Sequence, residues 1–101
     1  MKAPLPSEDT DKQEPQRWRP EVMALADAME AKLKANDHKR HWRYLGMQTL
    51  SMRLTQEREE LRRAVEAGDP DEVLREAADV ANFAMMIADT VRQQHKTANK
   101  K

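Results

Sequence analysis

The sequence contains no cysteine and only two glycines among its 101 residues, and aromatic residues make up 4% of it. The lack of cysteine excludes a disulfide framework, a thiolate nucleophile and a cysteine-bound zinc, which fits a reducing compartment. Few glycines and aromatic residues, together with 36% charged residues, favour long helices over a β-sandwich. A chain of this length holds one domain at most.

The chain also lacks a net charge and a long apolar run. Eighteen basic residues balance eighteen acidic ones, so we expect no general attraction to nucleic acid or to anionic membranes. The N-terminal segment MKAPLPSEDTDKQEP has no apolar core of a signal peptide. The longest weakly polar run, residues 80–88, contains Asn82 and is too short to cross a bilayer. These features predict a soluble, cytoplasmic protein whose partners are neither nucleic acid nor membrane.

Three helical segments are predicted between two polar tails. Residues 1–19 carry three prolines among mixed charges and are predicted to be a flexible arm. Residues 93–101 are polar and basic and are predicted to be a frayed tail. The body, residues 20–92, is therefore expected to be an all-α domain, a compact bundle of about three main helices.

The helix ends are marked by turn and capping residues. The first helix is predicted to begin at Pro20 and to end near Asn36, after an apolar stripe at three- and four-residue steps. The second is predicted to follow Gly46 and to end at a C-terminal cap formed by Gly68.

The third helix has the clearest start. Asp69 is the predicted N-cap, Pro70 the first helical residue, and Glu72 completes a capping box. The helix is expected to run to about Arg92. After Asp79 it is apolar on nearly every side, and such a helix needs neighbours all round. Three helices supply few, so a homodimer or a higher homo-oligomer is predicted.

Four carboxylates form two pairs, Glu57 with Glu60 and Glu76 with Asp79, and each pair is spaced three residues apart. At about 100° per residue, Glu57 and Glu76 fall within the apolar seams of the second and third helices, and their partners fall at the seam borders. Glu59 and Glu66 point away, and such outward carboxylates are ordinary solvated charges.

Carboxylates in an apolar seam cost several kcal/mol unless a cation or hydrogen bonds compensate them. Oxygen ligands suit hard ions, so the two pairs predict a site for Mg²⁺, with Mn²⁺ as a substitute. The alternative is that each pair is an ordinary helix surface whose charges are balanced by arginine three or four residues away. Four arginines are available for that role, namely Arg53, Arg62, Arg63 and Arg75.

The two motifs, E-x-x-E and E-x-x-D on consecutive helices, together with the segment EAADVANFAMMIAD, resemble the MazG-like superfamily of all-α nucleoside triphosphate pyrophosphohydrolases. The likeness is to its small single-domain bacterial and phage members and covers roughly residues 20–92. The resemblance implies Mg²⁺-dependent hydrolysis of an NTP or dNTP to a nucleoside monophosphate and diphosphate, which would cleanse the nucleotide pool.

The resemblance assigns Glu57, Glu60, Glu76 and Asp79 as metal ligands. Either Glu57 or Glu60 would also serve as general base on the attacking water. Gln56 stands where the family often has a further glutamate, and helical geometry turns it away from Glu57, so metal binding is expected to survive.

Four more residues are candidate substrate contacts. Asn82 bonds either a sugar hydroxyl or phosphate, or is a buried amide satisfied by a neighbouring helix. In the loop NDHKRHWRY, Trp42 either stacks on a base or covers the core. The resemblance also points to Asn36 and Lys39. Two rival functions remain open, a non-catalytic helical interaction module and a nucleotide-binding regulator without turnover.

Overall fold

The computed structural model describes residues 17–99, and these form an all-α arrangement without strands. Three α-helices, α1 (Pro20–Ala35), α2 (Met47–Ala67) and α3 (Pro70–Asn99), are joined by a loop with a short 3₁₀ helix, η1 (Trp42–Tyr44), and by a tight turn. The predicted fold class is confirmed. Most of the predicted arm, residues 1–16, lies outside the described residues.

The turn between α2 and α3 has the glycine cap and the N-cap that the sequence predicts, but only the Asp69 half of the predicted capping box. Gly68 ends α2 with a φ of 82°, a left-handed conformation that glycine adopts without steric cost. The side chain of Asp69 accepts hydrogen bonds from the backbone N–H groups of Asp71 at 3.0 Å and Glu72 at 3.4 Å. The side chain of Glu72 accepts from the guanidinium of Arg75 at 2.7 Å.

The third helix is longer than expected, because it ends at Asn99 and not near Arg92. Residues 93–99, expected as part of a frayed tail, contain no glycine or proline and are rich in good helix formers. Lys96 in the last turn also interacts favourably with the negative end of the helix dipole. The helix therefore continues beyond the part that packs against α2.

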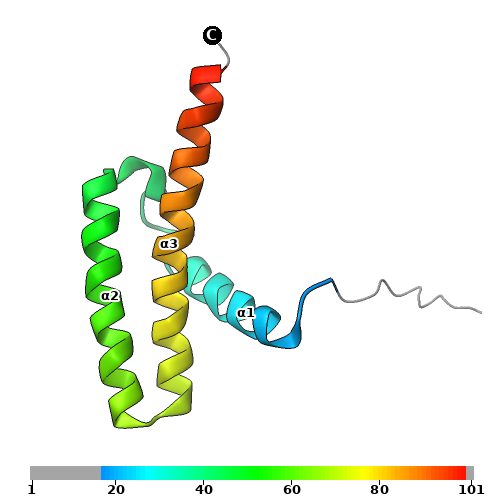
Figure 1. Ribbon diagram of the computed structural model, residues 1–101, viewed down its shortest axis with the longest axis vertical. Helices are drawn as coiled ribbons and strands as arrows, with labels where there is room; N and C mark the ends of the chain where they lie inside the picture. The colour runs from blue at the N-terminus through cyan, green and yellow to red at the C-terminus, as the bar shows by residue number, and fades with distance from the viewer. Residues whose placement is uncertain (1–16, 100–101) are drawn as a thin grey trace, which may run out of the picture.

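Helices α2 and α3 form an antiparallel hairpin, and α1 crosses α3 at a steep angle (Figure 1). The buried apolar side chains of the described chain are Leu50 and Ala64 on α2 and Ala78 on α3. Helix α1 has no fully buried residue. It is tied to α3 by the side-chain amide of Asn82, whose Nδ2 donates to the backbone carbonyl of Met29 at 3.1 Å.

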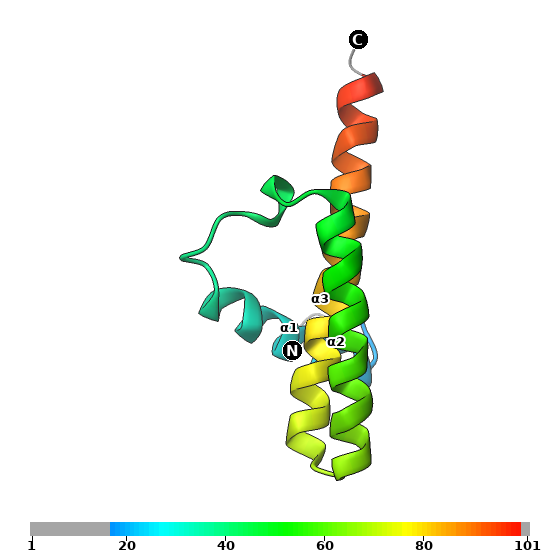
Figure 2. The ribbon, with the colours of Figure 1, turned by 90° about the vertical axis from the view of Figure 1, so that its left-hand side faces the viewer.

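The loop between α1 and α2 stands out from the hairpin on the same side as α1 (Figure 2). Its 3₁₀ helix is pinned to α3 by Asp89. The indole Nε1 of Trp42 donates to Asp89 Oδ2 at 2.9 Å, and Arg43 donates to both oxygens of the same carboxylate at 2.9 and 3.1 Å. These hydrogen bonds hold the pKa of Asp89 well below its usual range. The loop is thereby fixed as a wall of the space between α1 and the hairpin.

None of the helices within residues 17–99 combines the length and the apolar character that a membrane crossing requires.

Candidate functional site

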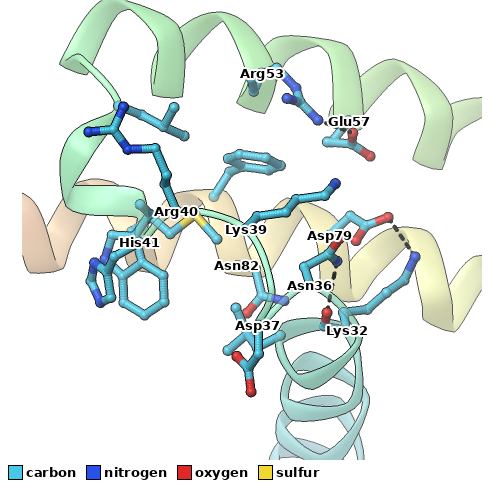
Figure 3. Close-up of a pocket in the computed structure, with 15 residues that line it drawn as sticks. Lys32, Asn36, Asp37, Lys39, Arg40, His41, Arg53, Glu57, Asp79 and Asn82 are labelled. Carbon is cyan, nitrogen blue, oxygen red and sulfur yellow. Dashed lines mark hydrogen bonds and ion pairs between the residues drawn. The ribbon is translucent and has the colours of Figure 1, made fainter.

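A pocket of about 340 Å³ lies where α1, the α1–α2 loop and the α2–α3 hairpin meet (Figure 3). Its walls include acidic, basic and ring side chains besides aliphatic residues and two asparagines. Acidic groups come from Asp37, Glu57 and Asp79, basic groups from Lys32, Lys39, Arg40 and Arg53, and rings from His41, Trp42 and Phe83.

Glu57 and Asp79 at one end of this pocket belong to a cluster of three carboxylates, which we call the acid cluster, and its third member, Glu76, is not a lining residue. Glu57 from α2 and Glu76 and Asp79 from α3 each offer one oxygen, and the three oxygens lie within 4.8 Å of one another. All three side chains are half-buried. The antiparallel hairpin creates the cluster, because it brings the inward faces of two consecutive helices together, as the sequence predicts for these three residues.

The acid cluster carries more negative charge than its surroundings balance. Burial, a hydrogen bond with Glu72 and the negative charge of Asp79 raise the pKa of Glu76 to about 7. Burial and the charge of Asp79 likewise raise the pKa of Glu57, although the nearby Arg53 acts in the opposite direction. A cluster with these shifts favours the arrival of positive charge.

Two cations from different helices reach the acid cluster. Lys32 Nζ lies 3.1 Å from Asp79 Oδ2, and Arg53 Nη2 lies 3.9 Å from Glu57 Oε2. The guanidinium of Arg53 also sits 5.0 Å from the centre of the Phe83 ring. In Figure 3 the side chain of Lys39 extends towards the same end of the pocket. Lys32 is not among the site residues that the sequence predicts. Its position next to the apolar stripe of α1, three residues after Met29, indicates a cation that faces the hairpin.

Glu60 is not part of the acid cluster. Its side chain is 52% exposed and lies 3.7 Å from Arg63 Nη1, which is the ordinary helix-surface arrangement that the sequence left open. Its charge still contributes to the raised pKa of Glu57. Of the four predicted ligands, the fold therefore brings three together and leaves the fourth at the border.

Asn82 lies in the pocket wall and is 3% exposed. Its Nδ2 is satisfied by the Met29 carbonyl, as expected for a buried amide held by a neighbouring helix. Its Oδ1 is buried and has no hydrogen-bond partner within residues 17–99. A hydrogen bond to the neighbouring helix therefore accounts for the NH₂ group of this amide but not for its oxygen.

The other three predicted contacts also line the pocket. Asn36 caps the C-terminal end of α1 and donates its side-chain amide to the Lys32 carbonyl at 2.9 Å. A turn then places Lys39, whose N–H bonds the Asn36 carbonyl at 2.9 Å. Trp42 is half-buried, and its ring lies 4.1 Å from that of His41. Asp89, which fixes Trp42, was not predicted and had no sequence signal beyond a carboxylate on an apolar helix.

Comparisons of the chain with models of protein families, with curated proteins and with solved structures gave no match. The resemblance to the MazG-like superfamily therefore rests on the sequence motifs alone.

Proposed function

We propose that the protein hydrolyses a nucleoside or deoxynucleoside triphosphate to the monophosphate and diphosphate with Mg²⁺ as cofactor. The observation that carries the proposal is a pocket in which Glu57 and Asp79, two members of the acid cluster, share the walls with the cations Lys32, Lys39 and Arg53. A triphosphate with its bound divalent ion presents the complementary charges. The resemblance of the two carboxylate motifs to pyrophosphohydrolases supports the same chemistry.

The residues of the acid cluster fit a magnesium ion. The donor set consists of oxygen atoms only, which is what Mg²⁺ prefers, and Mg²⁺ completes its shell with waters and phosphate oxygens. The three oxygens already lie within 4.8 Å of one another, so side-chain rotations alone would let Glu57, Glu76 and Asp79 hold one ion together. The raised pKa values of Glu76 and Glu57 reflect burial and repulsion between carboxylates. A bound divalent cation would offset that repulsion.

When bound, the ion would neutralise charge on the phosphates and lower the pKa of a water. The side chains of Lys32, Lys39 and Arg53 bind the phosphate oxygens through charge-assisted hydrogen bonds. The ring of Trp42 packs against the base. Glu57 is the better placed of the two candidate bases, because it lines the pocket, whereas the side chain of Glu60 is 52% exposed and lies against Arg63.

We also propose that the working form is a homodimer or a higher homo-oligomer. Within residues 17–99 the buried hydrophobic residues are Leu50, Ala64 and Ala78, a small core for a domain of this length. Several large apolar side chains are at least 40% exposed, among them Met52, Val65, Leu74 and Val91. A second copy of the chain would cover them, and light scattering on the purified protein measures the mass that decides this.

A panel of ribo- and deoxyribonucleoside triphosphates, assayed for diphosphate with Mg²⁺, tests the function. We expect diphosphate and monophosphate in equal amounts, and a melting temperature that rises with Mg²⁺ or Mn²⁺ and falls with a chelator. For a non-catalytic interaction module, neither metal nor nucleotide would change the melting temperature, and no diphosphate would be released. A regulator would bind the nucleotide and release no diphosphate.

A further inference from the structure

The side-chain oxygen of Asn82 is a hydrogen-bond acceptor that the described chain leaves without a partner. Its orientation follows from its other half, because the Met29 carbonyl oxygen can only accept a hydrogen bond and so must face Nδ2 and not Oδ1. The residue is 3% exposed, so bulk water does not satisfy the oxygen. Buried amide oxygens without a partner are rare in folded proteins, and this one belongs to a pocket wall.

The position of Asn82 along α3 indicates which part of a bound ligand could donate a hydrogen bond to its Oδ1. It follows Asp79 by three residues, which places it a little less than one turn, or about 4.5 Å, further along the helix. In Figure 3 it lies between the end of the pocket that holds Glu57 and Asp79 and the end that holds His41. A ligand that spans both ends has its middle beside Asn82.

We propose that Asn82 Oδ1 accepts a hydrogen bond from a hydroxyl of the sugar of the bound nucleotide, an inference that rests on the proposed function. A phosphate oxygen is itself an acceptor at neutral pH and offers no proton to Oδ1. The base lies beyond the sugar, next to the rings of Trp42 and His41. The sugar hydroxyls are the uncharged donors nearest to a phosphate held at the acid cluster.

The ligand must displace side chains that cover Oδ1. Leu33 and Met86 line the same pocket as Asn82, and methionine, with three rotatable bonds, adapts readily to a new neighbour. The hydrogen bond then forms in a site closed to water. Because an analogue without the hydroxyl leaves the acceptor unpaired, the pocket discriminates against dideoxynucleotides by about 10- to 100-fold.

Calorimetry with four α,β-methylene triphosphates of one base, in the presence of Mg²⁺, tests the proposal without turnover. The four sugars are ribose, 2′-deoxyribose, 3′-deoxyribose and 2′,3′-dideoxyribose. We expect the dideoxy compound to bind about 10- to 100-fold more weakly than the tightest of the others, and the two monodeoxy compounds identify the hydroxyl that is read. Equal affinity for all four overturns the proposal.

Two variants test whether Asn82 is the residue that discriminates between the four sugars. Asn82→Ala removes the acceptor and should bring the four affinities to within about twofold. Thr90→Val is the matched control, because Thr90 Oγ1 is the other buried oxygen without a partner in residues 17–99 and is not among the pocket-lining residues. Its discrimination should equal that of the unaltered protein. Discrimination that persists in a folded Asn82→Ala protein overturns the assignment, and if that variant does not fold, the four sugars on the unaltered protein decide.

A separate diphosphate assay distinguishes this inference from the proposed function. Diphosphate release without sugar discrimination refutes the role of Asn82 and leaves the hydrolase proposal standing. Sugar discrimination in binding without diphosphate release refutes hydrolysis and supports the role of Asn82. A protein that binds none of the four compounds refutes both.

Discussion

Helices α2 and α3 carry carboxylates on two faces, and the two faces behave in opposite ways. On the outer face, Glu59 and Glu66 both pair with Arg62, and its hydrogen bond to Glu59 lowers the pKa of that carboxyl. On the inner face, burial raises the pKa of Glu57 and of Glu76. Residues of the same type, within a few positions of each other, are thus stabilised as anions on one face and destabilised on the other.

The difference lies in the surroundings and not in the spacing. An outer carboxylate has an arginine three or four residues away on the same exposed strip of helix, in the arrangement typical of solvated helices. The inner carboxylates face one another across the hairpin. Glu57 also has Arg53 four residues away, but at 3.9 Å, and the ammonium group that pairs with Asp79 comes from a third helix, at Lys32. The clustering of carboxylates is therefore a product of the tertiary fold, and it is the reason why we place the proposed metal site on the inner face.

The largest expected effect comes from removing an inner carboxylate. Asp79→Asn or Glu57→Gln should reduce diphosphate release by about 100-fold or more and abolish the rise in melting temperature with Mg²⁺, because each removes a ligand oxygen with its charge. The measurements are steady-state diphosphate release and thermal melting with and without Mg²⁺. Both variants should fold, since neither change alters the size of the side chain.

Full activity in both inner-face variants would mean that the acid cluster is only structural. Glu60→Gln sharpens the test within the same motif. Because Glu60 lies outside the acid cluster and pairs with Arg63 at the surface, its replacement should reduce activity less than that of Glu57. An equal loss would show that the cluster rearranges to include Glu60 when the metal binds.

Asp89 offers a third case, a carboxylate close to the pocket that is fully paired. Asp89→Asn weakens the bonds to Trp42 and Arg43, so the loop that carries pocket residues becomes less well positioned. We expect the KM for the triphosphate to rise about tenfold with a smaller change in kcat, because ordering of the loop must then be supplied by substrate binding. Glu66→Gln, a surface control paired only within its own helix, should leave KM unchanged. A fall in kcat alone would contradict a role in substrate positioning.

The helices and their ends could be predicted from the sequence because they depend on local signals. Pro20, Gly68 and Asp69 each mark a boundary through their own backbone preference, and periodicity places Glu57 and Glu76 on inward faces and Asp79 at a seam border. Lys32 and Asp89 act through contacts with residues about 47 positions away along the chain. No local pattern encodes such a pairing. The outward position of Glu60 could not be predicted either, because a residue at a seam border can turn a flexible side chain inward or outward.

The raised pKa of Glu76 on the inner face also predicts how the stability of the folded protein depends on pH. The pKa of Glu76 is about 7 in the folded protein against an ordinary value of 4.5, so the native state binds the proton more tightly than the unfolded chain. Its contribution to stability is complete below about pH 4.5 and is lost as the pH rises to about 7. We expect the metal-free protein to melt on the order of 5 °C lower at pH 8 than at pH 5 because of this group.

Glu76→Gln removes the titration of Glu76 together with its effect on the pKa of Glu72, to which it is hydrogen-bonded. The melting temperature of the variant should depend less on pH between 5 and 8 than that of the unaltered protein. Added Mg²⁺ should restore the stability of the unaltered protein at pH 8, where the cluster is ionised. Identical pH profiles for the two proteins would contradict the raised pKa.

The smallest effect is expected on the outer face. Glu59→Gln removes the charge that pairs with Arg62 and Arg63, but all three side chains are 41% to 63% exposed, and exposed ion pairs contribute little because water and salt screen them. Diphosphate release should stay within about twofold of that of the unaltered protein, and the melting temperature should change by less than about 2 °C at moderate ionic strength. A loss of activity comparable to that of Glu57→Gln would mean that the charge of the whole helix, and not the inner face, governs catalysis.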